Sequence, residues 1–165
     1  MYRADKLREQ DKTDFYPELG NILTALLGDE KDCLANMANF TGLLFHQMED
    51  VNWVGFYILR GQDLVLGPYQ GKPACTRIAV GKGVCGTAAL GEETLVVPDV
   101  HQFPGHIACD ACSRSELVVP FKFQQIQGVL DLDSPRPNRF SQADALGLEA
   151  LLAMLHNHLD KNKRG

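Results

Sequence analysis

Apolar residues recur at two different periods along this chain, and the change of period divides it into helices and strands. Between residues 14 and 27 they follow the i, i+3, i+4, i+7 spacing of one helix face, which predicts an amphipathic helix. Its apolar stripe is Leu19, Ile22, Leu23 and Leu26. A second helix is predicted from about residue 31 to residue 46. Its inward-facing residues are predicted to be Leu34, Met37, Ala38 and Leu44 or Phe45.

The pattern becomes that of strands from residue 51 onward. Residues 51–59 are rich in β-branched and aromatic side chains, and turn residues 61–63 separate them from a second apolar run, which predicts a β-hairpin. Further strands are predicted over residues 76–80, 94–97, 116–121 and 126–132. The glycine-punctuated segment 81–91 is predicted to hold a short helix. The turn between the last two strands has no Gly or Asn pair, so its register stays open.

A last helix follows these strands. Ser141 and Asp144 have the spacing of a capping box, and leucines then repeat at helical spacing. These are Leu148, Leu151, Leu152, Leu155 and Leu159. The order of elements predicts an α/β (α+β) fold with a mainly antiparallel sheet flanked by helices. With neither linker nor repeat, residues 1–165 are expected to form one domain, with residues 1–13 as a polar N-terminal arm.

Charge and composition exclude some partners. The chain has 165 residues, with 16 Lys and Arg against 21 Asp and Glu, hence a net charge of −5. This balance does not favour a nucleic-acid partner. Neither a run of about 18 apolar residues nor a secretory signal is present, so no membrane partner is expected and the cytoplasm is the expected location.

Five cysteines in a cytoplasmic chain indicate metal binding or chemistry more than a disulfide framework. Cys33, in the second helix, is interpreted as a small core residue. Cys75 is expected to begin a strand, and Cys85 lies in the glycine-rich segment. Cys109 and Cys112 occupy a long loop, where a substrate or a partner thiol can reach them.

A zinc site is one alternative, because the CxxC pair at 109–112 with Cys75, Cys85 or His106 could supply four ligands. A single CxxC without a second pair is a weak zinc signal, and no metal site is predicted. His101 and His106 lie in the same loop and could tune a thiolate, although solvated loop residues are the favoured interpretation.

Strand alternation places Trp53, Gly55 and Tyr57 on one face and the neighbouring apolar residues on the other. Two aromatic rings with a glycine between them suit the floor of a site for a small apolar group. The alternative is that these rings simply pack under a helix.

Three carboxylates are candidates for chemistry. Asp131 and Asp133 project from one face of their strand, about 7 Å apart, a spacing that suits binding an ammonium group or carrying a proton. Crowding of like charges and partial burial raise the pKa of such a group. The alternative is a solvated strand end. Glu116 lies where a loop enters an apolar strand, either at a rim or aimed into a cleft.

These residues match a known family. The chain resembles the free methionine-(R)-sulfoxide reductases, small enzymes built on a GAF domain, over roughly residues 15–160. The matching segments are VNWVGFY, IAVGKGVCGTAA, VPDVHQFPGHIACD, SxSE at Ser113–Glu116, VVP and GVLDLDSP, with cysteines at 75, 85 and 109. A GAF sensor that lacks catalytic activity is not expected to carry three cysteines at this spacing.

The resemblance implies that Cys109 is the attacking cysteine, Cys75 its main resolving partner and Cys85 a second recycling thiol. Cys112 is not part of the family's pattern. An external dithiol such as thioredoxin would restore the thiols, without a cofactor, and the family suggests a homodimer.

The resemblance also implies a set of substrate-binding residues. Glu116, Asp131 and Asp133 match the acids that polarise the substrate, and Trp53 and Tyr57 match its aromatic pocket. The backbone around Ser115–Glu116 would receive the substrate carboxylate. The competing hypothesis is a non-catalytic GAF domain that senses a small ligand or the redox state.

Overall fold

The fold is centred on one six-stranded sheet with the strand order β3-β2-β1-β6-β5-β4. The structure is a computed structural model that describes residues 5–7, 12–106, 111–123 and 125–161. The strands are β1 (Trp53–Arg60), β2 (Asp63–Gly71), β3 (Arg77–Ala79), β4 (Leu95–Val97), β5 (Ser115–Phe123) and β6 (Ile126–Ser134). All neighbouring strands are antiparallel, which confirms the predicted fold class.

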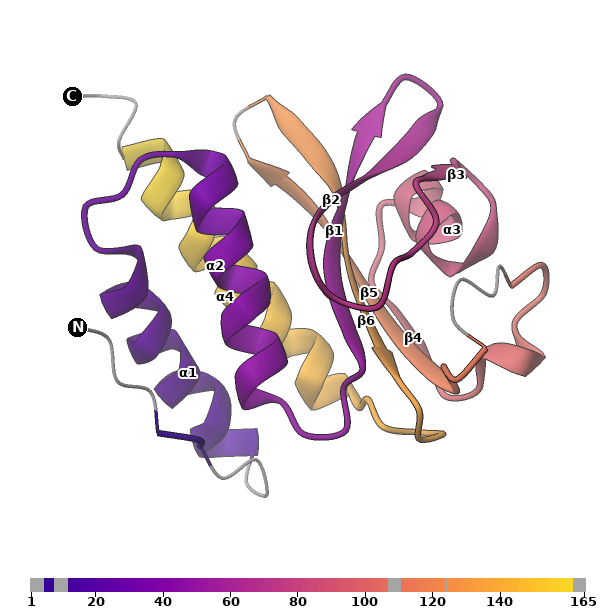
Figure 1. The fold of residues 1–165 in the computed structure, drawn as a ribbon, viewed down its shortest axis with the longest axis horizontal. Helices are drawn as coiled ribbons and strands as arrows, with labels where there is room; N and C mark the ends of the chain where they lie inside the picture. Colours follow the sequence, from indigo (N-terminus) through magenta and orange to yellow (C-terminus); the bar gives the residue numbers. More distant parts are fainter. Residues whose placement is uncertain (1–4, 8–11, 107–110, 124, 162–165) are drawn as a thin grey trace.

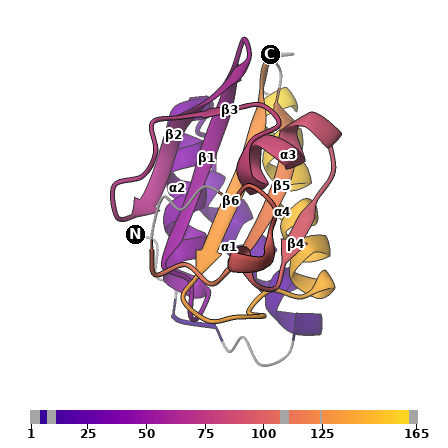
Figure 2. The ribbon, with the colours of Figure 1, turned by 90° about the vertical axis from the view of Figure 1, so that its right-hand side faces the viewer.

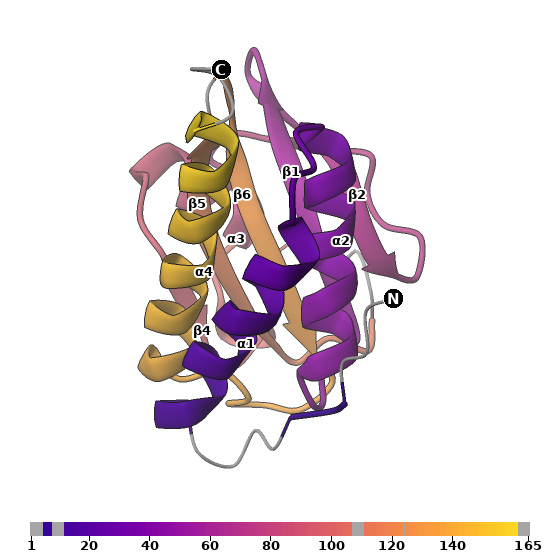
Figure 3. The same cartoon turned by 90° about the vertical axis from the view of Figure 1, so that its left-hand side faces the viewer.

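Helices cover both faces of this sheet. They are α1 (Lys12–Leu27), α2 (Cys33–Gln47), α3 (Gly83–Gly91) and α4 (Gln142–Lys161), with a 3-10 helix η1 (Val100–Gln102). Helices α1, α2 and α4 lie together on one face (Figures 1 and 3). Helix α3 lies on the opposite face with the loops around it (Figure 2). The sheet therefore separates two apolar clusters.

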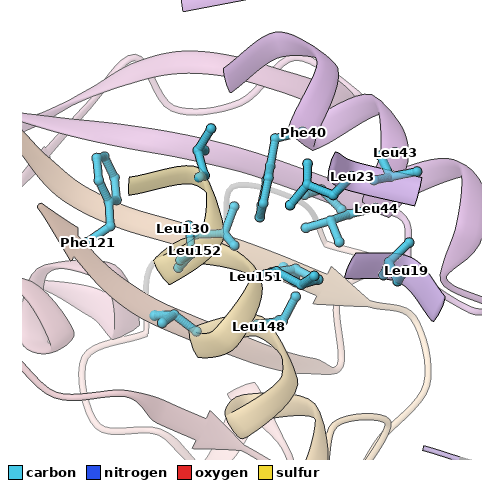
Figure 4. Close-up of a cluster of buried hydrophobic side chains, with 14 of the residues drawn as sticks. Leu19, Leu23, Phe40, Leu43, Leu44, Phe121, Leu130, Leu148, Leu151 and Leu152 are labelled. Carbon is cyan, nitrogen blue, oxygen red and sulfur yellow. The ribbon is translucent and has the colours of Figure 1, made fainter. Parts of the chain in front are cut away.

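The larger cluster fills the space between the sheet and the three long helices (Figure 4). Leu19 and Leu23 of α1 and Leu44 of α2 are fully buried there, against Leu130 of β6 and Leu151 of α4. Burying side chains of this size contributes about 1.5–3 kcal/mol each. The smaller cluster, under α3, includes Trp53 and Tyr57.

Two predictions about the helices need correction. Helix α1 begins at Lys12, so residues 12 and 13 of the expected arm are helical. In α2, Leu34 and Ala38 are exposed rather than buried. The face of α2 that packs against the core contains Cys33, Met37 and Phe40, which have helical spacing. Leu34, the residue after Cys33, is rotated away from this face and points towards solvent.

Local hydrogen bonds explain two further boundaries. The Ser141 backbone N–H donates to Asp144 Oδ2 at 2.9 Å, and the Asp144 N–H donates to Ser141 Oγ at 3.4 Å, so the predicted capping box is present. Phe123 pairs with Ile126, which sets the register of the β5–β6 hairpin. In the part of the chain described here, no helix is both long and apolar enough to cross a membrane.

Candidate active site

A small cavity of about 40 Å³ opens on the α3 side of the sheet. Its chemically active lining is Trp53, Tyr57, Cys85, His106, Glu116, Asp131 and Asp133. The strand register brings these side chains together, because Asp133 pairs with both Trp53 of β1 and Glu116 of β5. Residues 80 positions apart in the sequence thus become neighbours across three adjacent strands.

The aromatic floor comes from the alternation of β1. Trp53 and Tyr57 stack with ring centroids 5.8 Å apart, and both are buried. Gly55 lies between them, and a Cβ atom there would be 2.2 Å from Trp53 Cη2. A side chain at this position would therefore displace the indole. The shared face is confirmed, and the two rings both pack in the smaller cluster and line the cavity.

Glu116 and Asp131 are buried rather than solvated, and Asp133 is half-buried. Glu116 is 5% exposed and Asp131 is 6% exposed, which is incompatible with a solvated strand end at Asp131. Burial, reinforced by the charges of Asp131 and Asp133, raises the pKa of Glu116 well above its ordinary value of 4.5. Burial raises the pKa of Asp131 to about 6. Burial and its acidic neighbours therefore favour the protonated form of Glu116.

Asp131 Oδ1 is buried and has no hydrogen-bond partner among the described residues. A buried carboxylate oxygen without a donor costs free energy, because water has been removed and nothing has replaced it. The cavity thus offers an acceptor that a bound cationic or N–H group would satisfy.

Cys85, on α3, adjoins this acid group. Its thiol is buried and donates a hydrogen bond to Glu116 Oε1, 3.7 Å away. Burial, followed by the charges of Asp131 and Glu116, raises the pKa of Cys85 well above its ordinary value of 9.0. The next residue, Gly86, has to be glycine, since a Cβ there would lie 2.5 Å from the Ala79 carbonyl oxygen. Cys85 is therefore a neutral thiol in this arrangement.

His106 was expected to be a solvated loop residue, and this prediction is wrong. Its side chain lines the cavity, and Nε2 lies 3.8 Å from Glu116 Oε2. Burial, followed by the proximity of His101, lowers the pKa of His106 below 6.5, so the ring is neutral at pH 7. His101 itself is exposed, as expected.

The remaining cysteines occupy different environments. Cys75 is half-buried in the loop between β2 and β3, two residues before β3 rather than at its start, and it is part of a disulfide bond. Cys33 is half-buried and its thiol lies 3.7 Å from Met37 Sδ, in keeping with a packing role. Cys112 is exposed. Cys109, the expected attacking residue, lies outside the described residues.

The side chain of Ser115 does not reach the cavity. Its hydroxyl donates to the Arg136 carbonyl oxygen at 2.6 Å, and it shares the helix-facing side of β5 with Leu117. Ser113, the first serine of the SxSE motif, lines the cavity instead. Its buried Oγ has no hydrogen-bond partner in the described part of the chain. The unused hydroxyl therefore belongs to Ser113.

Within the described ranges, Cys85, Glu116 and Asp131 are the residues that could ligate a metal ion, with one atom from each within 4.8 Å of the others. The raised pKa values of Cys85 and Glu116 mean that a cation would have to displace protons from these two groups to bind. The alternative zinc site at residues 109–112 lies partly outside the described residues.

Comparison with known proteins defines the class to which this fold and site belong. The GAF domain model matches residues 21–159, so the chain belongs to the GAF family. It is 49% identical over 150 residues to the free methionine-R-sulfoxide reductase of Escherichia coli, covering 90% of this chain and 91% of that one. Within the GAF family, the chain belongs to the free methionine-R-sulfoxide reductases.

Solved structures agree with this assignment. The free methionine-R-sulfoxide reductase of Neisseria meningitidis, in complex with its substrate, is 40% identical, with a TM-score of 0.90 and 99% of each chain covered. The reduced form of fRMsr from Staphylococcus aureus is 48% identical, with a TM-score of 0.83, covering 87% of this chain and 94% of that one.

Proposed function

We propose that this chain reduces free L-methionine-(R)-sulfoxide to L-methionine. The observation that carries the proposal is the buried acid Glu116, beside Asp131 in a cavity floored by Trp53 and Tyr57, where burial raises its pKa and favours its protonated form. A sulfoxide oxygen accepts a hydrogen bond, and protonating it makes the sulfur electrophilic. The reductase activity named for the relatives from E. coli and Saccharomyces cerevisiae supports the same reaction.

Specificity for the free amino acid, rather than for a methionine residue in a protein, requires contacts to both ends of the substrate. Asp131 and Asp133 supply acceptors for the ammonium group, and the unpaired Asp131 Oδ1 is one of them. The methyl sulfoxide group lies on the Trp53 and Tyr57 rings. The carboxylate faces the Ser113–Glu116 segment, where the Ser113 hydroxyl is an additional donor.

Cys109 carries the oxygen in the first step. Its thiolate attacks the substrate sulfur while Glu116 protonates the oxygen. As the hydroxyl passes to the cysteine sulfur, the substrate S–O bond and the transient S–S bond break and a new S–O bond forms, so that a thiol and a sulfoxide become a sulfenic acid and methionine. Cys85 is not the nucleophile of this first step, because burial raises the pKa of its thiol well above the ordinary value.

The second step regenerates the enzyme. The Cys75 thiol condenses with the Cys109 sulfenic acid, forming a disulfide and releasing water. A dithiol protein such as thioredoxin then reduces this disulfide and becomes oxidised itself, with Cys85 as a second recycling thiol. In this proposal two copies of the chain, each a single GAF domain, form a homodimer in the reducing cytoplasm. The reaction needs no cofactor.

The deciding assay supplies the R and S epimers of free and peptide-bound methionine sulfoxide, with dithiothreitol or thioredoxin. We expect methionine from the free R epimer alone. Cys109→Ser should abolish turnover, whereas the control Cys33→Ser should retain it. A chain that binds the free R epimer but produces no methionine would be a sensor instead of an enzyme. Turnover in Cys109→Ser would refute the assignment of the nucleophile.

A further inference from the structure

The two aromatic residues that floor the cavity also hold the loop that carries Cys75. The Tyr57 hydroxyl donates a hydrogen bond to the Cys75 carbonyl oxygen at 2.8 Å. The Trp53 indole N–H donates to the Lys72 carbonyl oxygen at 3.0 Å. Both donors come from β1, whereas both acceptors lie between β2 and β3. The cavity floor and the cysteine loop are therefore one connected unit.

The loop has little regular structure of its own. Residues 72–76 are neither helix nor strand, and Lys72, Pro73 and Thr76 are exposed. At its far end the Thr76 carbonyl accepts a backbone hydrogen bond from Leu66 at 3.0 Å. An exposed loop of this kind opens readily unless it is tied to a rigid element. The side chains of β1 provide such ties at Lys72 and Cys75.

The two donors are themselves fixed. Tyr57 is 1% exposed, and the Trp53 ring stacks between Tyr57 and Tyr69, with centroid distances of 5.8 and 5.4 Å. At the end of β2, Gly71 has φ +124°, and a Cβ there would lie 2.7 Å from Trp53 Cδ1. Glycine thus allows the chain to enter the loop directly against the indole. Burial, reinforced by the Asp131 charge, raises the pKa of Tyr57 far above 10, so its hydroxyl remains a donor.

We propose that Tyr57 is a positioning residue for Cys75, holding its backbone so that its sulfur reaches the oxidised sulfur of Cys109. The proposal rests on the proposed function and adds a role in recycling to the residue's contact with substrate. In this step the Cys75 thiolate attacks the sulfenic sulfur. The S–S bond forms, the S–O bond breaks, and the hydroxide takes up a proton and leaves as water.

The geometric demand of a disulfide explains why such a tie matters. Bridged Cα atoms lie about 4.4–6.8 Å apart, so a cysteine in a loosened loop spends less time within reach. Fixing the loop raises the effective concentration of the Cys75 thiol at the sulfenic acid. Removing the hydroxyl of Tyr57 should therefore slow disulfide closure relative to the release of methionine.

The test is a single turnover of the fully reduced protein with the free R epimer and no external reductant. Methionine is quantified by chromatography, and thiols by acid quench, alkylation and mass spectrometry. In Tyr57→Phe the ratio of the disulfide-closure rate to the methionine-release rate should fall roughly three- to tenfold, the effect of one hydrogen bond. Dimedone should trap correspondingly more sulfenic acid. Trp53→Phe, which removes the other donor, should change this ratio in the same direction.

Tyr69→Phe is the matched control, because it removes a hydroxyl from a ring that stacks on Trp53 and leaves both donors in place. A parent-like ratio in both Tyr57→Phe and Trp53→Phe would overturn the positioning role. A parallel series oxidised by hydrogen peroxide measures the same condensation without methionine sulfoxide. If the parent chain produces no methionine, the proposed function fails, and the peroxide series still decides whether Tyr57 positions Cys75.

Discussion

The thiol of Cys85 donates a hydrogen bond to Oε1 of Glu116 across 3.7 Å and so connects α3 to β5 inside the cavity. Burial raises the pKa of both groups, and the charges of Asp131 and Glu116 raise the pKa of Cys85 further. The hydrogen bond from Cys85 opposes the shift at Glu116 only in part, since the pKa of Glu116 is still raised well above 4.5. Such an environment keeps an acid protonated and a thiol neutral. This environment favours a proton donor and disfavours a thiolate nucleophile. We therefore assign proton donation to Glu116 and nucleophilic attack to Cys109.

The first prediction concerns Glu116 as the proton donor. Glu116→Gln keeps the shape of the side chain but removes its transferable proton. The rate of methionine release in a single turnover should fall about 100-fold or more. Because only the protonated acid donates, the parent rate should decline as pH rises through the raised pKa of Glu116. This decline should be absent from the residual rate of Glu116→Gln.

Glu149→Gln is the control for this substitution. Glu149 lies on α4 and accepts a hydrogen bond from the Thr94 hydroxyl at the surface, at 2.6 Å. Its loss should leave the rate within about twofold of the parent, since surface substitutions have small effects. Parent-like release in Glu116→Gln, with the same pH profile, would transfer the role of acid to Asp131 or Asp133.

The second prediction concerns the close contact between Gly55 and the Trp53 indole. In Gly55→Ala the new Cβ would lie 2.2 Å from Trp53 Cη2 and 2.7 Å from Tyr69 Cβ, so the indole must move. Overpacking of this kind costs about 1–3 kcal/mol of unfolding free energy, and displacing the aromatic floor should raise the KM for the sulfoxide. Urea unfolding and steady-state kinetics measure the two effects.

Gly42→Ala provides the matched comparison. Gly42 lies within α2, and a Cβ there would meet nothing within 4 Å. The substitution should stabilise the protein by up to about 1 kcal/mol, because alanine favours helix over glycine, and leave the KM unchanged. Equal tolerance of alanine at positions 55 and 42 would contradict the requirement for glycine under the indole.

Sequence periodicity predicted much of the fold because each element has a strong local signal. The alternation in β1 placed Trp53 and Tyr57 on one face without any knowledge of the partner strands. The stripe of α1 and the leucines of α4 likewise identified the core. The short-range pattern failed at Leu34, where the first turn of α2 leaves the buried stripe.

The candidate site was harder to predict because it depends on long-range register. Nothing local indicates whether Glu116 is buried; the pairing of β5 with β6 places it beside Asp133 and under α3. His106 and Ser113 come from loops, where periodicity carries no information, and they reach the cavity through tertiary packing. Strand alternation turns the Ser115 side chain to the helix-facing side, whereas the prediction from the motif concerned the backbone around Ser115–Glu116 and stays a prediction.

The third prediction concerns the buried carboxylate of Asp144, which is far in sequence from two of its partners, Lys12 and Tyr16. It accepts a hydrogen bond from the Tyr16 hydroxyl at 2.7 Å and pairs with Lys12 at 2.9 Å and Arg139 at 3.6 Å. Burial alone would raise the pKa of Asp144. Hydrogen bonds from Lys12, Tyr16 and the Ser141 backbone outweigh burial and lower the pKa below its ordinary value of 3.8.

A lowered pKa in the folded state stabilises the protein above the pKa of the unfolded chain, and this stabilisation is lost as pH falls through the folded value. Asp144→Asn should therefore lower the unfolding free energy at pH 7 by about 3–5 kcal/mol, because two cations lose their partner. Its stability should also fall less steeply than the parent's in acid. Asp160→Asn, which removes an exposed pair with His156 at 3.2 Å, should cost less than about 1 kcal/mol. Urea unfolding across a pH series measures both effects. If the unfolding free energies of Asp144→Asn and the parent fell equally steeply with decreasing pH, the charge of Asp144 would not stabilise the contact between α1 and α4.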